Sequence, residues 1–146
     1  MTDALLERIA TALDRIAPPL PEPAFPGARA YGWTGTGLAA MSDFRPLPLH
    51  LLTGIDMQRD TLLANTRRLA QGHAAHDALL WGARGTGKSA LVKAVAGALQ
   101  DEGQNLALVE LPSPRLGTLP ALFRTLANWS RPTIVFLDDL AFDRNG

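Results

Sequence analysis

Apolar residues follow a helical period in some stretches of the chain and form short continuous runs in others. The helical period predicts helices over residues 1–17, 56–70 and 88–99, and a fourth helix that begins after a capping Thr118. The continuous runs predict buried strands at residues 78–81, 105–111 and 133–137. Strands that alternate with helices of this length are typical of βαβ units. We therefore expect an α/β fold built around a parallel sheet.

The first predicted helix is amphipathic. Its apolar stripe consists of Leu5, Leu6, Ile9, Leu13 and Ile16, and charged residues occupy other positions. We expect this stripe to pack against the rest of the protein. A partner helix or a membrane surface is the alternative, which the lack of a Lys/Arg excess on the polar side disfavours.

The second predicted helix has four residues that we expect to face inward, namely Leu62, Leu63, Thr66 and Leu69. Asp56 is its predicted N-cap, and Gly72 follows its end.

Residues 18–50 separate the first helix from the regular pattern. The stretch "PPLPEPAFPG" is extended by its prolines and is expected to be an arm or linker. The following glycine-rich stretch contains Tyr31, Trp33 and Phe44, and we expect it to be irregular structure lying on the main domain. The pattern thus divides the chain into an N-terminal helix (1–17), an arm (18–50) and a domain (51–146).

The composition narrows the functional classes. Apolar residues make up 47% of the sequence, and the fourteen basic residues equal the acidic ones, so net charge indicates neither a nucleic-acid nor a membrane partner. The absence of cysteine excludes disulfides and thiolate chemistry. The N-terminus lacks the apolar core of a signal peptide, and no apolar run is long enough to span a bilayer. We expect a cytoplasmic protein.

One stretch, "GARGTGKS", fits the phosphate-loop pattern G-x-x-x-x-G-K-[ST] in full. Its glycines allow successive backbone N–H groups to surround phosphate oxygens, and the following helix adds its dipole. Lys88 is expected to reach the β- and γ-phosphates, and Ser89 to ligate Mg²⁺. The alternative is a glycine turn with a solvated lysine. The predicted nucleotide-binding residues here are Gly82, Ala83, Arg84, Gly85, Thr86, Gly87, Lys88, Ser89 and Ala90.

A pair of carboxylates follows the last predicted strand in "TIVFLDDL". Asp138 is placed at the carboxyl edge of the sheet, where ligands gather in open α/β folds, and we expect it to hold Mg²⁺. Asp139 is a candidate catalytic residue, together with Lys88, because a carboxylate there could orient the attacking water. A helix cap or a solvated turn is the alternative for this pair.

Residues 45–143, with "LLTGIDMQRD", "DALLWGARGTGKSALVKAVAGAL" and "FLDDLAFD", resemble the bacterial AAA-type ATP-binding family catalogued as a domain of unknown function. The resemblance implies a three-layer P-loop fold, ATP with Mg²⁺, and adenine contacts from Leu52, Gly54 and Ile55. It also implies ring assembly, and ATP hydrolysis that remodels or loads a macromolecular partner. Most AAA-type proteins have Glu where this chain has Asp139.

The resemblance covers the N-terminal part of such a domain. In AAA-type sheets a further strand lies between the strand before the phosphate loop and the strand that ends at Asp138. Without that strand we expect a gap one strand wide, bordered by two unpaired edges. A P-loop kinase, which would need an acceptor pocket and a lid, and a truncated fragment that binds nucleotide without hydrolysing it remain the alternatives.

Overall fold

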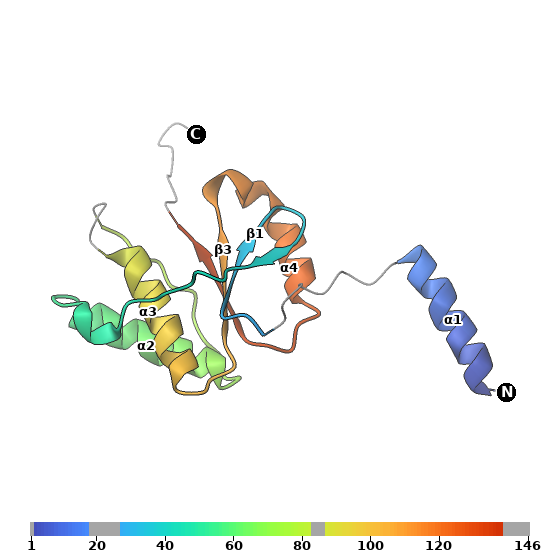
Figure 1. Cartoon of the computed structure of the whole chain (residues 1–146), viewed down its shortest axis with the longest axis horizontal. Coiled ribbons are helices and arrows are strands. Elements are labelled where there is room, and N and C mark those ends of the chain that lie inside the picture. Colours follow the sequence, from blue (N-terminus) through green and yellow to red (C-terminus); the bar gives the residue numbers. More distant parts are fainter. Residues whose placement is uncertain (1, 18–26, 83–86, 139–146) are drawn as a thin grey trace.

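Four short strands form one open sheet in the order β2-β1-β3-β4 (Figure 1). The computed structural model describes residues 2–17, 27–82 and 87–138. The strands are β1 (Ala30–Trp33), β2 (Leu38–Ala40), β3 (Ala107–Leu111) and β4 (Thr133–Leu137). β1, β3 and β4 are parallel, and β2 runs antiparallel to β1. The expected α/β class with a mostly parallel sheet is confirmed.

The central strand β3 determines the register of the sheet. It pairs with β4 along its whole length, from Ala107 opposite Thr133 to Leu111 opposite Leu137, and with β1 from Ala30 opposite Leu108. The sequence ALVEL is apolar on both faces except at Glu110, as expected for a strand of a parallel sheet that is covered on both sides.

Helices cover the two faces of the sheet unequally. On one face lie α2 (Asp56–Ala70) and α3 (Lys88–Asp101), with the short 3-10 turn Leu49–Leu51 against α3. On the other face α4 (Leu119–Leu126) follows a 3-10 turn at Ser113–Thr118. One apolar cluster, around Leu122 of α4 and Tyr31 of β1, fills the α4 side. Two clusters, around Val92 and Leu99 of α3, fill the other.

The predicted helices are present, with small changes at their ends. α2 has the predicted bounds and turns its predicted inner residues, Leu62, Leu63, Thr66 and Leu69, toward α3 and the sheet. Asp56 is the first residue of α2 instead of its N-cap, and its carboxylate pairs with Arg59 at 3.0 Å. Thr118 occupies the N-cap position of α4 without capping it, because its hydroxyl donates to the Arg115 carbonyl at 2.6 Å.

The glycine-rich stretch after residue 27 is not irregular as expected. It forms the hairpin of β1 and β2, with Tyr31 and Trp33 buried on the α4 side of the sheet. Trp33 Nε1 donates to Thr118 Oγ1 at 2.8 Å, and the Tyr31 ring meets Trp129 edge-on with a 5.3 Å centroid separation. The "TGTG" after Trp33 is the turn of this hairpin, closed by a hydrogen bond from Thr34 N to Gly37 O.

The strand predicted at 78–81 is not formed, and this prediction is wrong. Residues 74–81 have no regular structure, and the side chains of Leu79 and Trp81 are 69% and 86% exposed. A strand requires a hydrogen-bonded neighbour. Within the described residues the sheet ends at β4, and no strand lies between β4 and this segment. β3 also begins at Ala107, two residues later than predicted.

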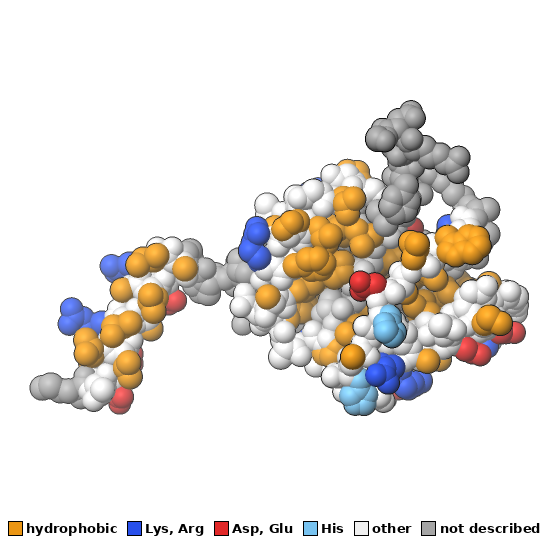
Figure 2. Space-filling view, turned by 180° about the vertical axis from the view of Figure 1, so that it is seen from behind, with side chains coloured by type: hydrophobic (Ala, Val, Ile, Leu, Met, Phe, Trp, Pro, Cys, Tyr) orange, Lys and Arg blue, Asp and Glu red, His pale blue; other side chains and the backbone are white. Residues whose placement is uncertain are grey.

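The helix α1 (Thr2–Ile16) is confirmed, but its apolar stripe is not packed as expected. None of its residues is buried, and Leu5, Leu6, Ile9, Leu13 and Ile16 are all exposed. Figure 2 shows apolar side chains exposed along this helix. None of the helices in the described part of the chain combines the length and the apolar character that a membrane span requires.

Candidate phosphate and metal site

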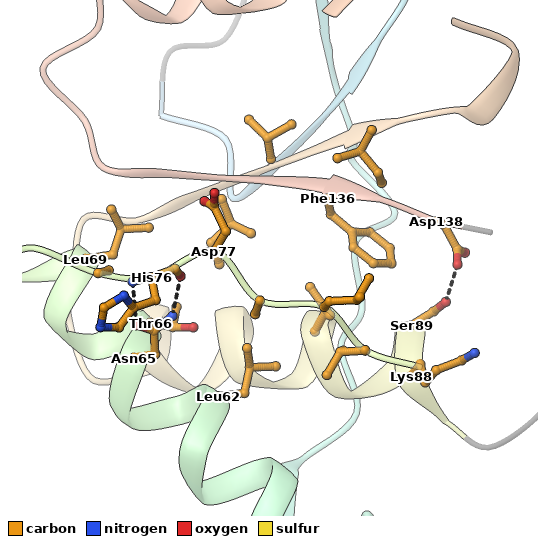
Figure 3. Close-up of a pocket in the computed structure, with 18 of the residues that line it drawn as sticks. Leu62, Asn65, Thr66, Leu69, His76, Asp77, Lys88, Ser89, Phe136 and Asp138 are labelled. Atoms are coloured by element: carbon orange, nitrogen blue, oxygen red, sulfur yellow. Dashed lines mark hydrogen bonds between the residues drawn. The ribbon is translucent and has the colours of Figure 1, made fainter. Parts of the chain in front are cut away.

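The structure brings Ser89 and Asp138 into contact although they are far apart in the sequence. Ser89 lies in the first turn of α3, and Asp138 directly follows β4. The Ser89 hydroxyl donates to Asp138 Oδ1 at 2.9 Å, as Figure 3 shows. The backbone carbonyl of Asp138 accepts a hydrogen bond from Ser113 Oγ at 2.8 Å, which ties it to the turn after β3. The two residues predicted to hold Mg²⁺ are therefore adjacent.

The N-terminus of α3 has the geometry of an anion site. Gly87 precedes the helix with φ of 84°, a left-handed conformation that favours glycine, and among the described residues no side chain caps the helix. The first N–H groups of a helix have no partner within it and carry the positive end of the helix dipole. Lys88 adds an ammonium group at this end, where Nζ donates to the Gly82 carbonyl at 2.7 Å.

These residues lie at one end of a long groove of about 1020 Å³. One wall is formed by residues 75–82 and the other by β4, while side chains of α2 and α3 form the floor. In Figure 3 Leu62 points toward the groove from α2, and Phe136 points into it from β4. The groove corresponds in position to the gap expected between the segment before the phosphate loop and the strand that ends at Asp138.

The predicted site residues divide into three groups. Those that line the groove are Gly82, Gly87, Lys88, Ser89, Ala90 and Asp138. Those that lie outside the described residues are Ala83, Arg84, Gly85, Thr86 and Asp139. Those that the structure does not bring to the groove are Leu52, Gly54 and Ile55: Leu52 and Ile55 pack against the cluster of Leu91 and Leu99, and Gly54 is exposed.

Two further pairs near the site had no signal in the sequence. The Asn65 side chain bonds to both backbone groups of His76, donating from Nδ2 to O at 2.7 Å and accepting from N at 2.9 Å. This fixes the start of the wall 75–82 on α2. One turn after Ser89, the Lys93 ammonium pairs with the Glu110 carboxylate of β3 at 3.0 Å, which ties β3 to α3. Neither pair belongs to a local motif.

The donor set suits a hard cation and a polyphosphate. A hydroxyl and a carboxylate are oxygen ligands of the kind that Mg²⁺ prefers, and it usually shares them with phosphate oxygens. An ammonium group and an uncapped helix N-terminus favour the phosphates. The residues present thus fit Mg²⁺ together with a phosphorylated ligand.

Comparison with known proteins gives one match. The family described as "Protein of unknown function (DUF815)" matches residues 27–146, which include the whole sheet, α2, α3 and α4. Among curated proteins and among solved structures no match was found.

Proposed function

Since this chain belongs to the DUF815 family, whose function is unknown, we propose its function from the site: a Mg²⁺-dependent ATP-binding protein of the AAA-type P-loop class. The observation that carries the proposal is the hydrogen bond between Ser89 and Asp138 at 2.9 Å. The phosphate-loop pattern ends in Lys88 and Ser89, and a P-loop site needs a carboxylate beside that hydroxyl. Here that carboxylate is Asp138, which directly follows β4.

Each residue of the proposed site has a separate task. Lys88 and the N–H groups that begin α3 hold the β- and γ-phosphates, and Ser89 and Asp138 hold Mg²⁺. The bound metal neutralises charge on the phosphates. Asp139 orients the attacking water, so that the complete form hydrolyses ATP. We further propose that hydrolysis remodels or loads a macromolecular partner, in a homo-oligomer.

Calorimetric titration with Mg·ATP tests the binding step. We expect Lys88→Ala to weaken ATP binding by more than tenfold, because hydrogen bonds to a charged group contribute about 1.5–3 kcal/mol. Lys93→Ala is the matched control, since Lys93 lies on the same helix but pairs with Glu110 and does not line the groove. Equal ATP affinity of the Lys88→Ala variant and the unmodified protein would contradict the proposal.

The metal ligands are tested by the same titration with and without Mg²⁺. Asp138→Asn and Ser89→Ala should reduce the gain in ATP affinity that Mg²⁺ gives and leave the metal-free affinity nearly unchanged.

Phosphate release from ATP, compared with an Asp139→Asn variant, then tests hydrolysis. Phosphoryl transfer to an added acceptor without phosphate release in water would favour the kinase alternative.

A further inference from the structure

Asp138 lies just beyond the last paired position of β3 and β4. The two strands pair in register up to Leu111 and Leu137, and Asp138 follows directly. On the β3 side the next residue is Pro112, which has no backbone N–H group to donate to the chain after β4. The backbone ladder between the two strands therefore ends before it reaches the proposed metal ligand.

Two hydroxyl groups hold Asp138 at this point. Ser113 Oγ donates to the Asp138 carbonyl at 2.8 Å, and the Asp138 carboxylate accepts a hydrogen bond from Ser89 at 2.9 Å. The hydroxyls come from different elements, the turn after β3 and the first turn of α3. Asp138 and Ser113 are both exposed, so hydrogen bonds and not burial fix their positions. The main chain and the side chain of Asp138 are thus each held separately.

The turn that carries Ser113 is itself anchored to the sheet. It is the 3-10 turn Ser113–Thr118, whose last hydroxyl donates to the Arg115 carbonyl at 2.6 Å. The same hydroxyl accepts a hydrogen bond at 2.8 Å from Nε1 of Trp33, which is buried in β1. The Arg115 guanidinium also donates to the Thr34 carbonyl, in the hairpin turn between β1 and β2. Ser113 therefore projects from a turn that these contacts fix to β1 and its hairpin.

We propose that Ser113 is a positioning residue for the metal site: by holding the Asp138 backbone, it keeps the carboxylate beside Ser89 in the orientation that binds Mg²⁺. This role rests on the proposed function, because it exists only if Ser89 and Asp138 hold Mg²⁺. The ion demands nearly ideal octahedral geometry, so a ligand that is fixed in advance binds it better than one that must be ordered on binding. Hydrogen-bond partners of metal ligands influence metal affinity in this way.

Calorimetric titration of the full chain with ATP, with and without Mg²⁺, tests this role. Ser113→Ala should reduce the gain in ATP affinity that Mg²⁺ gives by about three- to tenfold, the contribution of one neutral hydrogen bond. The metal-free ATP affinity should stay unchanged, because Lys88 and the start of α3, which hold the phosphates, are left intact. Ser113→Thr keeps the hydroxyl and should restore most of the gain. Ser113 is exposed, so neither substitution should disturb the fold.

Thr125→Val is the matched control for the loss of a hydroxyl. The Thr125 hydroxyl also donates to a main-chain carbonyl, that of Ala121 at 3.1 Å, but within α4. The gain that Mg²⁺ gives should be the same in this variant as in the unmodified protein. An equal reduction in Thr125→Val and Ser113→Ala overturns the proposal, as does a Ser113→Thr variant that binds Mg·ATP as weakly as Ser113→Ala.

A double-mutant comparison tests whether Ser113 acts through Asp138. Once Asp138→Asn has removed the carboxylate, Ser113→Ala should cause no further loss of the gain that Mg²⁺ gives. Equal losses with and without Asp138→Asn overturn the positioning role and leave the proposed function intact. The same holds if Asp138→Asn reduces the gain and Ser113→Ala does not. If Mg²⁺ gives no gain in ATP affinity to the unmodified protein, the proposed function and the positioning role are both overturned.

Discussion

Gly97 shows how a single residue controls the position of α3. A glycine inside a helix normally costs about 0.5–1 kcal/mol relative to alanine. Here a Cβ atom at residue 97 would lie 2.9 Å from Cβ of Pro46 and closer still to its Cγ. The Gly97 carbonyl also accepts a hydrogen bond from Arg29 at 3.1 Å. The missing side chain therefore lets the chain before α2 lie directly on α3.

We expect Gly97→Ala to lower the free energy of unfolding by about 1–3 kcal/mol, because the added methyl group overpacks this contact. Urea denaturation measures the change. In a Pro46→Gly background the same substitution should be neutral or should stabilise by about 0.5–1 kcal/mol, since only the helix propensity then remains. A loss of equal size in both backgrounds would show that Pro46 is not the cause.

Among the elements, the long amphipathic helices could be predicted from the sequence, and the pairing of the strands could not. The apolar spacing of α2 and α3 gave their positions within about two residues, because each helix contains its own backbone hydrogen bonds. β1 was missed because Gly32 and the glycines of the following turn hide a strand whose partner, β3, lies far along the chain. Residues 78–81 have the composition of a strand, but strand formation depends on a neighbour that no local pattern reveals.

In the candidate site, too, residues in local motifs could be predicted from the sequence, and residues whose role depends on distant partners could not. Lys88, Ser89 and Asp138 could be selected from motif and spacing because their chemistry is local to a loop and a strand end. Asn65 could not, because its role depends on how α2 lies beside His76.

A variant of Asn65 tests whether α2 holds the wall 75–82 in place. Asn65→Ala removes both hydrogen bonds to the His76 backbone and should lower stability by about 1–2 kcal/mol. Amide exchange in residues 77–81 should become faster at the same time. Asn128→Ala is the control, because Asn128 lies just after α4 and, among the described residues, its side chain bonds only to the Arg124 carbonyl. If amide exchange in residues 77–81 stays unchanged, the Asn65 contact of α2 does not hold this wall in place.

For the molecule as a whole, Arg131 joins the starts of the three parallel strands. Its guanidinium donates to the Ala28 carbonyl at 2.6 Å and to the Leu106 carbonyl at 2.9 Å, just before β1 and β3, while Arg131 itself precedes β4. Both contacts are partly buried. These contacts lie at the end of the sheet opposite Asp138. They therefore stabilise the sheet without contacting the candidate site.

Arg131→Met keeps most of the side-chain stem and removes the donors, so we expect a loss of about 2–3 kcal/mol in unfolding free energy. Arg45→Met is the control. Within the described part of the chain Arg45 bonds only to the nearby carbonyls of Ser42 and Phe44, so the loss on its substitution should stay within about 0.5 kcal/mol. Thermal and urea unfolding measure both. If both variants lose the same unfolding free energy, the Arg131 contacts at the strand starts contribute no special stability.

The pairing of β1 with β3 also sets an order of events during synthesis. Ala30 leaves the ribosome early, but its partner Leu108 is made about 80 residues later, which takes roughly 4–16 s at 5–20 residues per second. A two-stranded hairpin is marginally stable by itself. Tyr31 and Trp33 therefore have no sheet to join during this interval, so the nascent chain exposes two large aromatic rings until β3 emerges.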